Sequence, residues 1–116
     1  MRKQYYFRQS ERGLLAWDVD RLVELSRDFP RIQVRLSDVE GDHDWSDDVA
    51  AHDRLIDEAD LSFPIILAAD GRVMDGRHRI AKAIREGHDT IAAVQFERDP
   101  EPDYVGRGPD ELPYES

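Results

Sequence analysis

The chain has 116 residues, of which 40% are hydrophobic and 36% are charged, and its formal net charge is −10. This length and composition are typical of one globular domain with a heavily charged surface. The absence of cysteine excludes disulfides, thiolate metal sites and cysteine nucleophiles, and it fits a cytoplasmic location. The longest apolar run, residues 65–69, is far shorter than the roughly 20 residues of a membrane-spanning helix, so we expect no membrane partner.

Residues 5–17 carry aromatic and leucine side chains and are expected to form a short extended arm. Asp18 is a favourable N-cap for a helix whose apolar side chains recur at helical spacing until Pro30. Residues 32–36 alternate apolar and polar side chains, which predicts a half-buried strand.

An acidic loop over residues 41–46 follows, and Ser46 can cap a second helix with an apolar face over residues 49–59. Residues 63–69 then predict a buried strand, and Asp70-Gly71 is a strong hairpin signal that leads into a second strand over 72–75.

Gly76 begins a third predicted helix, and Gly87 ends it as a left-handed cap. Residues 90–96 predict the last strand, and the four prolines that follow favour an extended chain over a helix.

This order of elements predicts a single compact α+β domain with a small mixed sheet and about three helices. We divide it into an N-terminal arm and helix over residues 1–31, a core over 32–96, and an extended, acidic, proline-containing tail over 97–116.

Charge is distributed unevenly along the chain. Residues 38–60 carry ten acidic side chains against one basic one, whereas residues 70–87 carry five basic side chains against three acidic ones. A phosphate backbone is repelled by a strongly acidic surface, so we do not expect the chain to bind duplex DNA on its own. The basic segment over 70–87 is the place where an anionic partner would bind.

The first turn of the predicted third helix carries Gly76, Arg77, His78 and Arg79. A helix N-terminus has roughly half a positive charge and unpaired backbone N–H groups, so cationic side chains are unfavourable there. They become favourable when an anion binds, because amides, dipole and side chains then act on it together. We therefore predict a phosphate- or nucleotide-binding site at these four residues, with Gly76 allowing close approach of the backbone.

A structural interpretation of the same cations is also open. They could pair with the acidic residues 38–60 and hold the fold together. Arg79 could lie over the core, and His78 could be a buried histidine with its hydrogen bonds satisfied.

The sequence around this turn resembles the ParB/sulfiredoxin superfamily. Residues 61–67 (Leu-Ser-Phe-Pro-Ile-Ile-Leu), a short hairpin and residues 75–83 (Asp-Gly-Arg-His-Arg-Ile-Ala-Lys-Ala) are similar to the ParB N-terminal domain in order and spacing. That family has a proline before an apolar strand, then a hairpin, then a glycine followed three residues later by an arginine. Sulfiredoxins carry a related Gly-Cys-His-Arg signature, and superfamily kinases of free serine carry Asp-Gly-His-His-Arg. Residues 32–96 match the pattern, and the resemblance implies nucleotide phosphates at the helix N-terminus.

The differences from these relatives narrow the range of activities that we expect. Arg77 stands where sulfiredoxin has its reactive cysteine, which excludes reduction of a sulfinic acid. Arg77 and His78 replace the Glu and Arg of the ParB signature, and the second, arginine-rich CTP-binding motif of ParB is missing. The segment after residue 96 is too short for a helix-turn-helix domain, so we do not expect operator binding. The closest local motif is that of the kinase-like branch.

Phosphoryl transfer would need carboxylates that hold Mg²⁺, and a base. Asp75 adjoins the helix start, and Asp42 lies in the loop after the strand over 32–36, where the kinase-like relatives carry a functional glutamate. The candidate catalytic residues are therefore Asp75, Asp42 and His78, and the candidate cofactor is a nucleoside di- or triphosphate with Mg²⁺. No metal ligand set is assigned, and a solvated acidic loop is the alternative for Asp42.

The leading hypothesis is a nucleotide- or phosphate-binding protein, with or without phosphoryl transfer or phosphodiester hydrolysis. The alternatives are a non-catalytic interaction module of the same fold and a ParB-like, DNA-associated protein of the nuclease type. The net charge counts against the last.

Overall fold

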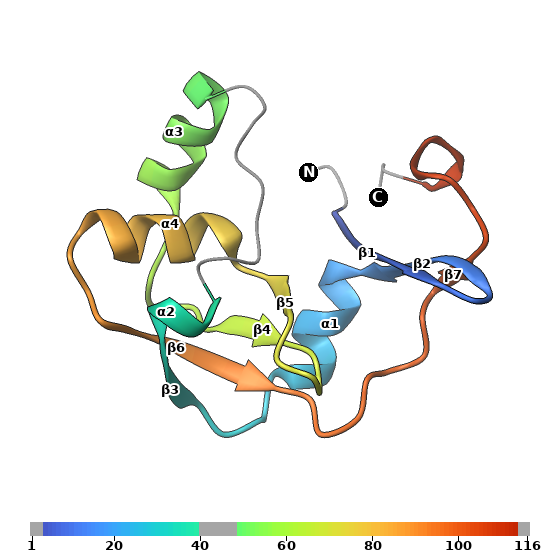
Figure 1. Cartoon of the computed structure of the whole chain (residues 1–116), viewed down its shortest axis with the longest axis horizontal. Helices are drawn as coiled ribbons and strands as arrows, with labels where there is room; N and C mark the ends of the chain where they lie inside the picture. The colour runs from blue at the N-terminus through green and yellow to red at the C-terminus, as the bar shows by residue number, and fades with distance from the viewer. Residues whose placement is uncertain (1–3, 40–48, 114–116) are drawn as a thin grey trace.

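The computed structural model describes residues 4–39 and 49–113. The elements within these ranges are β1 (Tyr5–Ser10), β2 (Gly13–Asp18), α1 (Val19–Ser26), β3 (Ile32–Arg35), α2 (Leu36–Val39), α3 (Val49–Glu58), β4 (Ile65–Leu67), β5 (Val73–Asp75), α4 (Arg77–Arg85), β6 (Thr90–Gln95), β7 (Tyr104–Val105) and the 3₁₀-helix η1 (Pro109–Glu111). The combination of helices and sheets in one compact unit confirms the predicted α+β class (Figure 1). Within the same ranges, no helix is long and apolar enough to cross a membrane.

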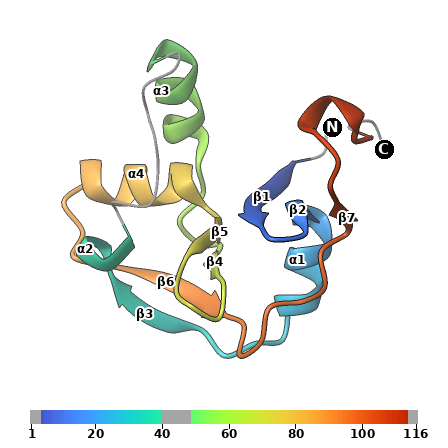
Figure 2. The ribbon, with the colours of Figure 1, turned by 45° about the vertical axis from the view of Figure 1, so that its right-hand side comes forward.

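The strands form two sheets. The larger has the order β3-β6-β4-β5 and is mixed, because β4 is parallel to β6 while the other neighbours are antiparallel. The smaller consists of β1, β2 and β7, all antiparallel. Figure 2 shows the smaller sheet and α1 in one half of the molecule, and the larger sheet with α2, α3 and α4 in the other.

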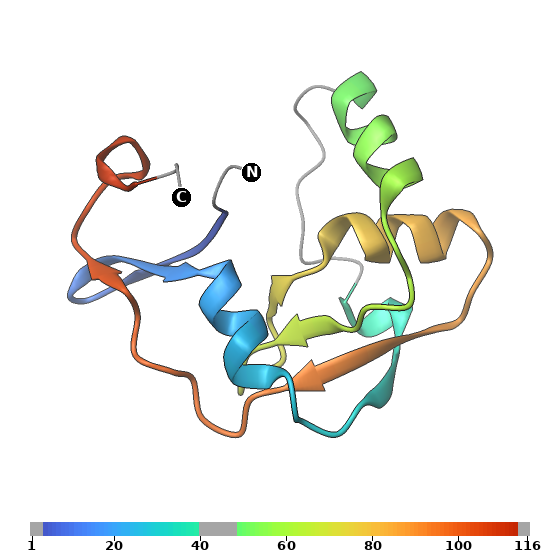
Figure 3. The same ribbon diagram turned by 180° about the vertical axis from the view of Figure 1, so that it is seen from behind.

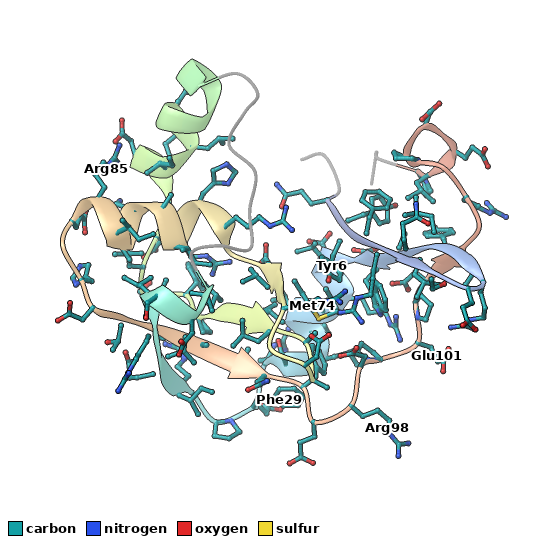
Figure 4. The ribbon with its side chains drawn as sticks, in the orientation of Figure 1. Tyr6, Phe29, Met74, Arg85, Arg98 and Glu101 are labelled. Carbon is teal, nitrogen blue, oxygen red and sulfur yellow. The ribbon has the colours of Figure 1, made fainter. Side chains whose placement is uncertain are left out.

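The larger sheet is covered on both faces, and alternate residues of its strands serve the two faces. The cluster toward α1 and the β1–β2 hairpin consists of Tyr6, Leu15, Trp17, Leu22, Ile66, Ala68, Met74, Val94 and Phe96, with Phe29 packed against it. The cluster toward α2 and α4 consists of Leu36, Val39, Ile65, Leu67, Val73, Ile80, Ala83, Ile91 and Ala93. Figure 4 shows Tyr6 and Met74 together where the hairpin meets the sheet.

Several local predictions are confirmed. The side chain of Asp18 caps α1 by accepting a hydrogen bond from the backbone N–H of Asp20 at 2.9 Å. The Asp70-Gly71 turn joins β4 to β5, and α4 begins directly after Gly76. The strand predicted over residues 63–69 is shorter, because only Ile65–Leu67 pairs in the sheet.

The arm expected over residues 5–17 is an antiparallel hairpin in which Ser10 pairs with Gly13. Its connection, Glu11-Arg12, is not the Asn-Gly or Asp-Gly pair of the commonest hairpin turns, and the signal in the sequence is Gly13, which follows it with φ of +103°. The structure has a fourth α-helix, α2, which begins at Leu36, the residue predicted to end the strand over 32–36. A single helical turn is too short to display helical periodicity, which explains why it was not predicted.

The described part of the tail, residues 97–113, contains the 3₁₀-helix η1 and also pairs with the N-terminal part of the chain. Its strand β7 adds to β2 in the smaller sheet. The indole N–H of Trp17 donates to the carbonyl of Pro100 at 2.8 Å, and Arg21 forms an ion pair with Asp103 at 3.1 Å. Residues 97–113 therefore belong to the same substructure as the hairpin and α1.

Arg8 and Asp99 connect this substructure to the larger sheet. One carboxylate oxygen of Asp99 accepts from the Arg8 guanidinium at 3.0 Å, and the other accepts from the backbone N–H of Ala69 at 2.8 Å. The guanidinium also lies over the ring of Trp17. Burial opposes the charge of Arg8, but hydrogen bonds to Tyr6 and Asp99 outweigh it, so the pKa of Arg8 is raised.

Gly76 places the start of α4 against β4. Its φ of +109° lies in the region that favours glycine, and a Cβ added there would lie 2.5 Å from Cγ2 of Ile65. The close approach predicted for Gly76 is therefore made to a core side chain. This contact fixes the position of the helix N-terminus relative to the sheet.

We expect Gly76→Ala to destabilise the protein by about 3 kcal/mol, because backbone strain is added to overlap with Ile65. The control is Gly71→Ala: Gly71 has φ of +92°, but a Cβ there meets nothing within 4 Å. The control should lose only about 1 kcal/mol. Urea denaturation measures both, and equal losses would show that packing on Ile65 has no effect.

Candidate functional site

The start of α4 opens into a cleft of about 1150 Å³. The hairpin and α1 form one side of the cleft, and the segment that runs from α3 to β4 forms the other. Figure 3 shows α1 in front and this segment descending beside it. Residues 75–79 all line the cleft, so the structure brings these predicted site residues together. Asp42 lies outside the described residues.

The N-terminal turn of α4 has no side-chain cap. The first bond within the helix runs from the N–H of Ile80 to the carbonyl of Gly76 at 3.0 Å, so the preceding amides point beyond the helix end. The helix dipole adds positive potential at the same place. In α1, by contrast, Asp18 supplies an anionic cap. An anion is therefore favoured at the start of α4.

Arg79 is held by neighbouring parts of the chain. Its guanidinium donates to the carboxylate of Asp75 at 2.9 Å and to the carbonyl of Pro64 at 2.9 Å. The Arg79 and Asp75 side chains are only 16% and 19% exposed. The sequence predicts Arg79 as a phosphate ligand, and in the structure two of its N–H donors already have protein acceptors. Its direct contribution is to position the start of α4.

Arg77 differs from Arg79 although both belong to the same turn. It is exposed, lines the cleft, and forms no hydrogen bond or ion pair with the described part of the chain. His78 is half-buried between them and lines the cleft as well. Arg77 is therefore the cation best placed to contact an anion at the helix N-terminus.

The later cations of α4 serve a structural purpose. The ammonium of Lys82 donates to the carbonyls of Asp57 and Ala59 at 3.0 and 2.7 Å, close to the C-terminal end of α3. Arg85 forms an ion pair with the carboxylate of Asp57, and Figure 4 shows it beside α3. A cation at a helix C-terminus complements the helix dipole. These two cations therefore hold α4 against the end of α3.

Asp60 is an anion of the cleft that sequence analysis did not single out. The hydroxyl and backbone N–H of Ser62 both donate to one of its carboxylate oxygens, at 2.7 and 2.9 Å. These hydrogen bonds, with a smaller effect of Lys82 and Arg79, lower the pKa of Asp60. The spacing Asp-x-Ser is a recognisable signal for such a turn.

The carboxylates that the structure describes do not form a site suited to Mg²⁺. Asp75 is engaged by Arg79, and Asp60 is engaged by Ser62. Among the described residues, no three His, Asp or Glu side chains gather as a metal site requires. We therefore derive no reaction step through a metal ion.

Apolar side chains form much of the remaining wall. Phe63, in the segment between α3 and β4, is 59% exposed, and Val23 of α1 is 48% exposed. The hairpin contributes Tyr5, Tyr6 and Phe7. Nothing in the sequence indicates that residues so distant along the chain share one cleft.

Comparisons with protein families, with curated proteins and with solved structures found no match for this chain. The resemblance to the ParB/sulfiredoxin superfamily therefore rests on the sequence motifs alone.

We expect Arg79→Ala to lower the free energy of unfolding by about 2 kcal/mol, because it leaves Asp75 and the Pro64 carbonyl without their donor. Asp75→Asn should be milder, and the double variant should lose at least about 1 kcal/mol less than the sum of the two. The control cycle uses Arg72 and Asp70, an ion pair with side chains 56% and 49% exposed. Its coupling should be below about 0.5 kcal/mol. Additive losses at residues 79 and 75 would contradict the assigned role of Arg79.

Proposed function

We propose that this chain is a binding protein for a phosphate-containing small molecule. The observation that carries the proposal is the exposed Arg77, which has no partner among the described residues, beside the N-terminus of α4 in a cleft of about 1150 Å³. The ParB/sulfiredoxin resemblance favours a nucleoside di- or triphosphate as the ligand, with Mg²⁺ bound to its phosphates. A cytoplasmic location, favoured by the lack of cysteine, fits such a ligand.

The electrostatic contrast within the protein supports this function. The chain carries a net charge of −10, yet four arginines and three carboxylates line the cleft. Asp75 is neutralised by Arg79, and Glu58 by Arg54. At the start of α4, Arg77, the backbone amides and the helix dipole attract an anion, while Asp60 remains a negative charge in the lining of the cleft.

Binding is better supported than turnover. Phosphoryl transfer needs a base or metal-holding carboxylates beside the phosphate. Asp75, the nearest predicted carboxylate, already accepts from Arg79. Asp42 is outside the described residues, so it adds no support. A non-catalytic module that recognises a phosphate group is accordingly our favoured version of the proposal.

The described part of the tail does not block the cleft. None of the tail residues up to Pro113 lines it. The tail instead runs along β2 on the smaller sheet. A blocked cleft would have favoured an interaction module without a ligand, and the described part of the tail gives no such block.

Saturating nucleoside triphosphate should raise the melting temperature of the protein. At about 100 times Kd, the free energy of unfolding should rise by about 2.7 kcal/mol. Arg77→Gln should remove most of this gain without unfolding the free protein, because the Arg77 side chain is exposed. Differential scanning fluorimetry with and without Mg²⁺ measures the shifts.

Arg72→Gln is the matched control. It removes the same charge from an exposed arginine on the same β4–β5–α4 segment, but Arg72 pairs with Asp70 and does not line the cleft. Its ligand-induced shift should equal that of the wild type. An equal shift in Arg77→Gln would place the ligand elsewhere and refute the proposed site.

A further inference from the structure

Three exposed apolar side chains converge on the cleft from three separate elements. Val23 comes from α1, Leu55 from α3, and Phe63 from the segment before β4, with exposures of 48%, 46% and 59%. Single exposed hydrophobic residues are common on protein surfaces and need no explanation. An apolar lining that comes from separate elements on both sides of one cleft is less common and is typical of a binding surface.

Hydrogen bonds hold the segment that presents Phe63. Asp60 accepts from Ser62, and the N–H of Phe63 donates to the carbonyl of Asp60 at 3.2 Å. Arg31 donates to the carbonyl of Ser62 at 3.0 Å from the other side of the cleft. The exposed ring belongs to a turn that hydrogen bonds hold in place. The protein would therefore lose little conformational entropy when a ligand binds to the ring.

The size of the cleft exceeds what a phosphate group alone can fill. Clefts that hold small molecules usually measure about 300 to 1000 Å³, and this one measures about 1150 Å³. A phosphate at the start of α4 would leave the wall of Val23, Leu55 and Phe63 in water. The ligand must have an additional organic part to use that wall.

The charges around the apolar wall restrict what this organic part can be. Glu58 and Asp60 lie close along the chain to Leu55 and Phe63, and both line the cleft. Carboxylates such as these are anionic at neutral pH. A second anionic group at this end would meet like charges, whereas an uncharged aromatic or aliphatic group would not.

We propose that Val23, Leu55 and Phe63 form an apolar subsite, and that the ligand is a phosphate ester, with one or more phosphate groups, whose organic part is uncharged and either aromatic or bulky aliphatic. The proposal rests on the proposed function, since the phosphate is bound at Arg77 and the start of α4. The cationic part of the lining then recognises the phosphate, and the apolar part recognises the organic group of the same molecule. Affinity is set by the apolar area of the ester, and charge fixes its orientation.

A series of probes that share one phosphate group tests the subsite. Inorganic phosphate, methyl phosphate, phenyl phosphate and 1-naphthyl phosphate are titrated into the full chain by calorimetry. Affinity should rise along the series, by about tenfold from methyl to phenyl phosphate, because the ring buries apolar surface. Arg77→Gln should weaken all four probes by a similar factor.

Two variants of α1 provide the matched comparison. Val23→Ser removes an apolar side chain of the cleft, whereas Leu25→Ser removes one of similar exposure, 43%, that does not line the cleft. Both residues are exposed, so both variants should fold. Val23→Ser should reduce the preference for naphthyl over methyl phosphate, and Phe63→Ser should reduce it further. Leu25→Ser should retain the wild-type preference.

The outcomes separate the two proposals. If none of the probes binds, the proposed phosphate-binding function is wrong, and so is the proposed apolar subsite. If all four bind with the same Kd, phosphate binding stands and the apolar subsite is wrong. If sedimentation shows self-association that Val23→Ser abolishes and Leu25→Ser does not, the wall is a protein interface and the subsite proposal is overturned.

Discussion

The guanidinium of Arg79 links three parts of the chain that together determine where the candidate site lies. It binds Asp75 at the end of β5, it binds the carbonyl of Pro64 just before β4, and its own backbone belongs to the first turn of α4. Next to it, Gly76 packs directly on Ile65 with no room for a side chain. Hydrogen bonds and close packing act on the same turn. The position of the helix N-terminus relative to the sheet is therefore fixed as closely as that of a core side chain.

The cations of this short helix therefore have different roles. Arg79 is used to hold the turn in place, and Lys82 and Arg85 hold α3 through its C-terminal end. Arg77 alone among the arginines and lysine of α4 is left without a partner in the described structure. A helix whose other cations are all satisfied internally can present one charge at a defined position, and such a charge is better suited to recognition than a diffuse basic surface.

Much of the larger sheet and of the α4 turn could be predicted from the sequence, because their signals are local. The apolar run at 65–67, the Asp70-Gly71 turn and the glycine at 76 each depend on neighbouring residues only. The difference between Arg77 and Arg79 could not be predicted, since it depends on Pro64, which is brought close only by the fold. The apolar wall was missed for the same reason.

The bond between Arg8 and Asp99 has a consequence for the order in which the molecule assembles. These residues are 91 positions apart in the chain, and the pairing of Leu15 with Val105 in the smaller sheet spans a similar separation. Closing such long loops is slow compared with forming a local hairpin or helix. The β4–β5–α4 unit can form early, whereas the hairpin side of the cleft is fastened only after the tail has been synthesised and has docked. Until then Trp17 lacks its hydrogen bond to Pro100, and the two sides of the cleft are not yet held together.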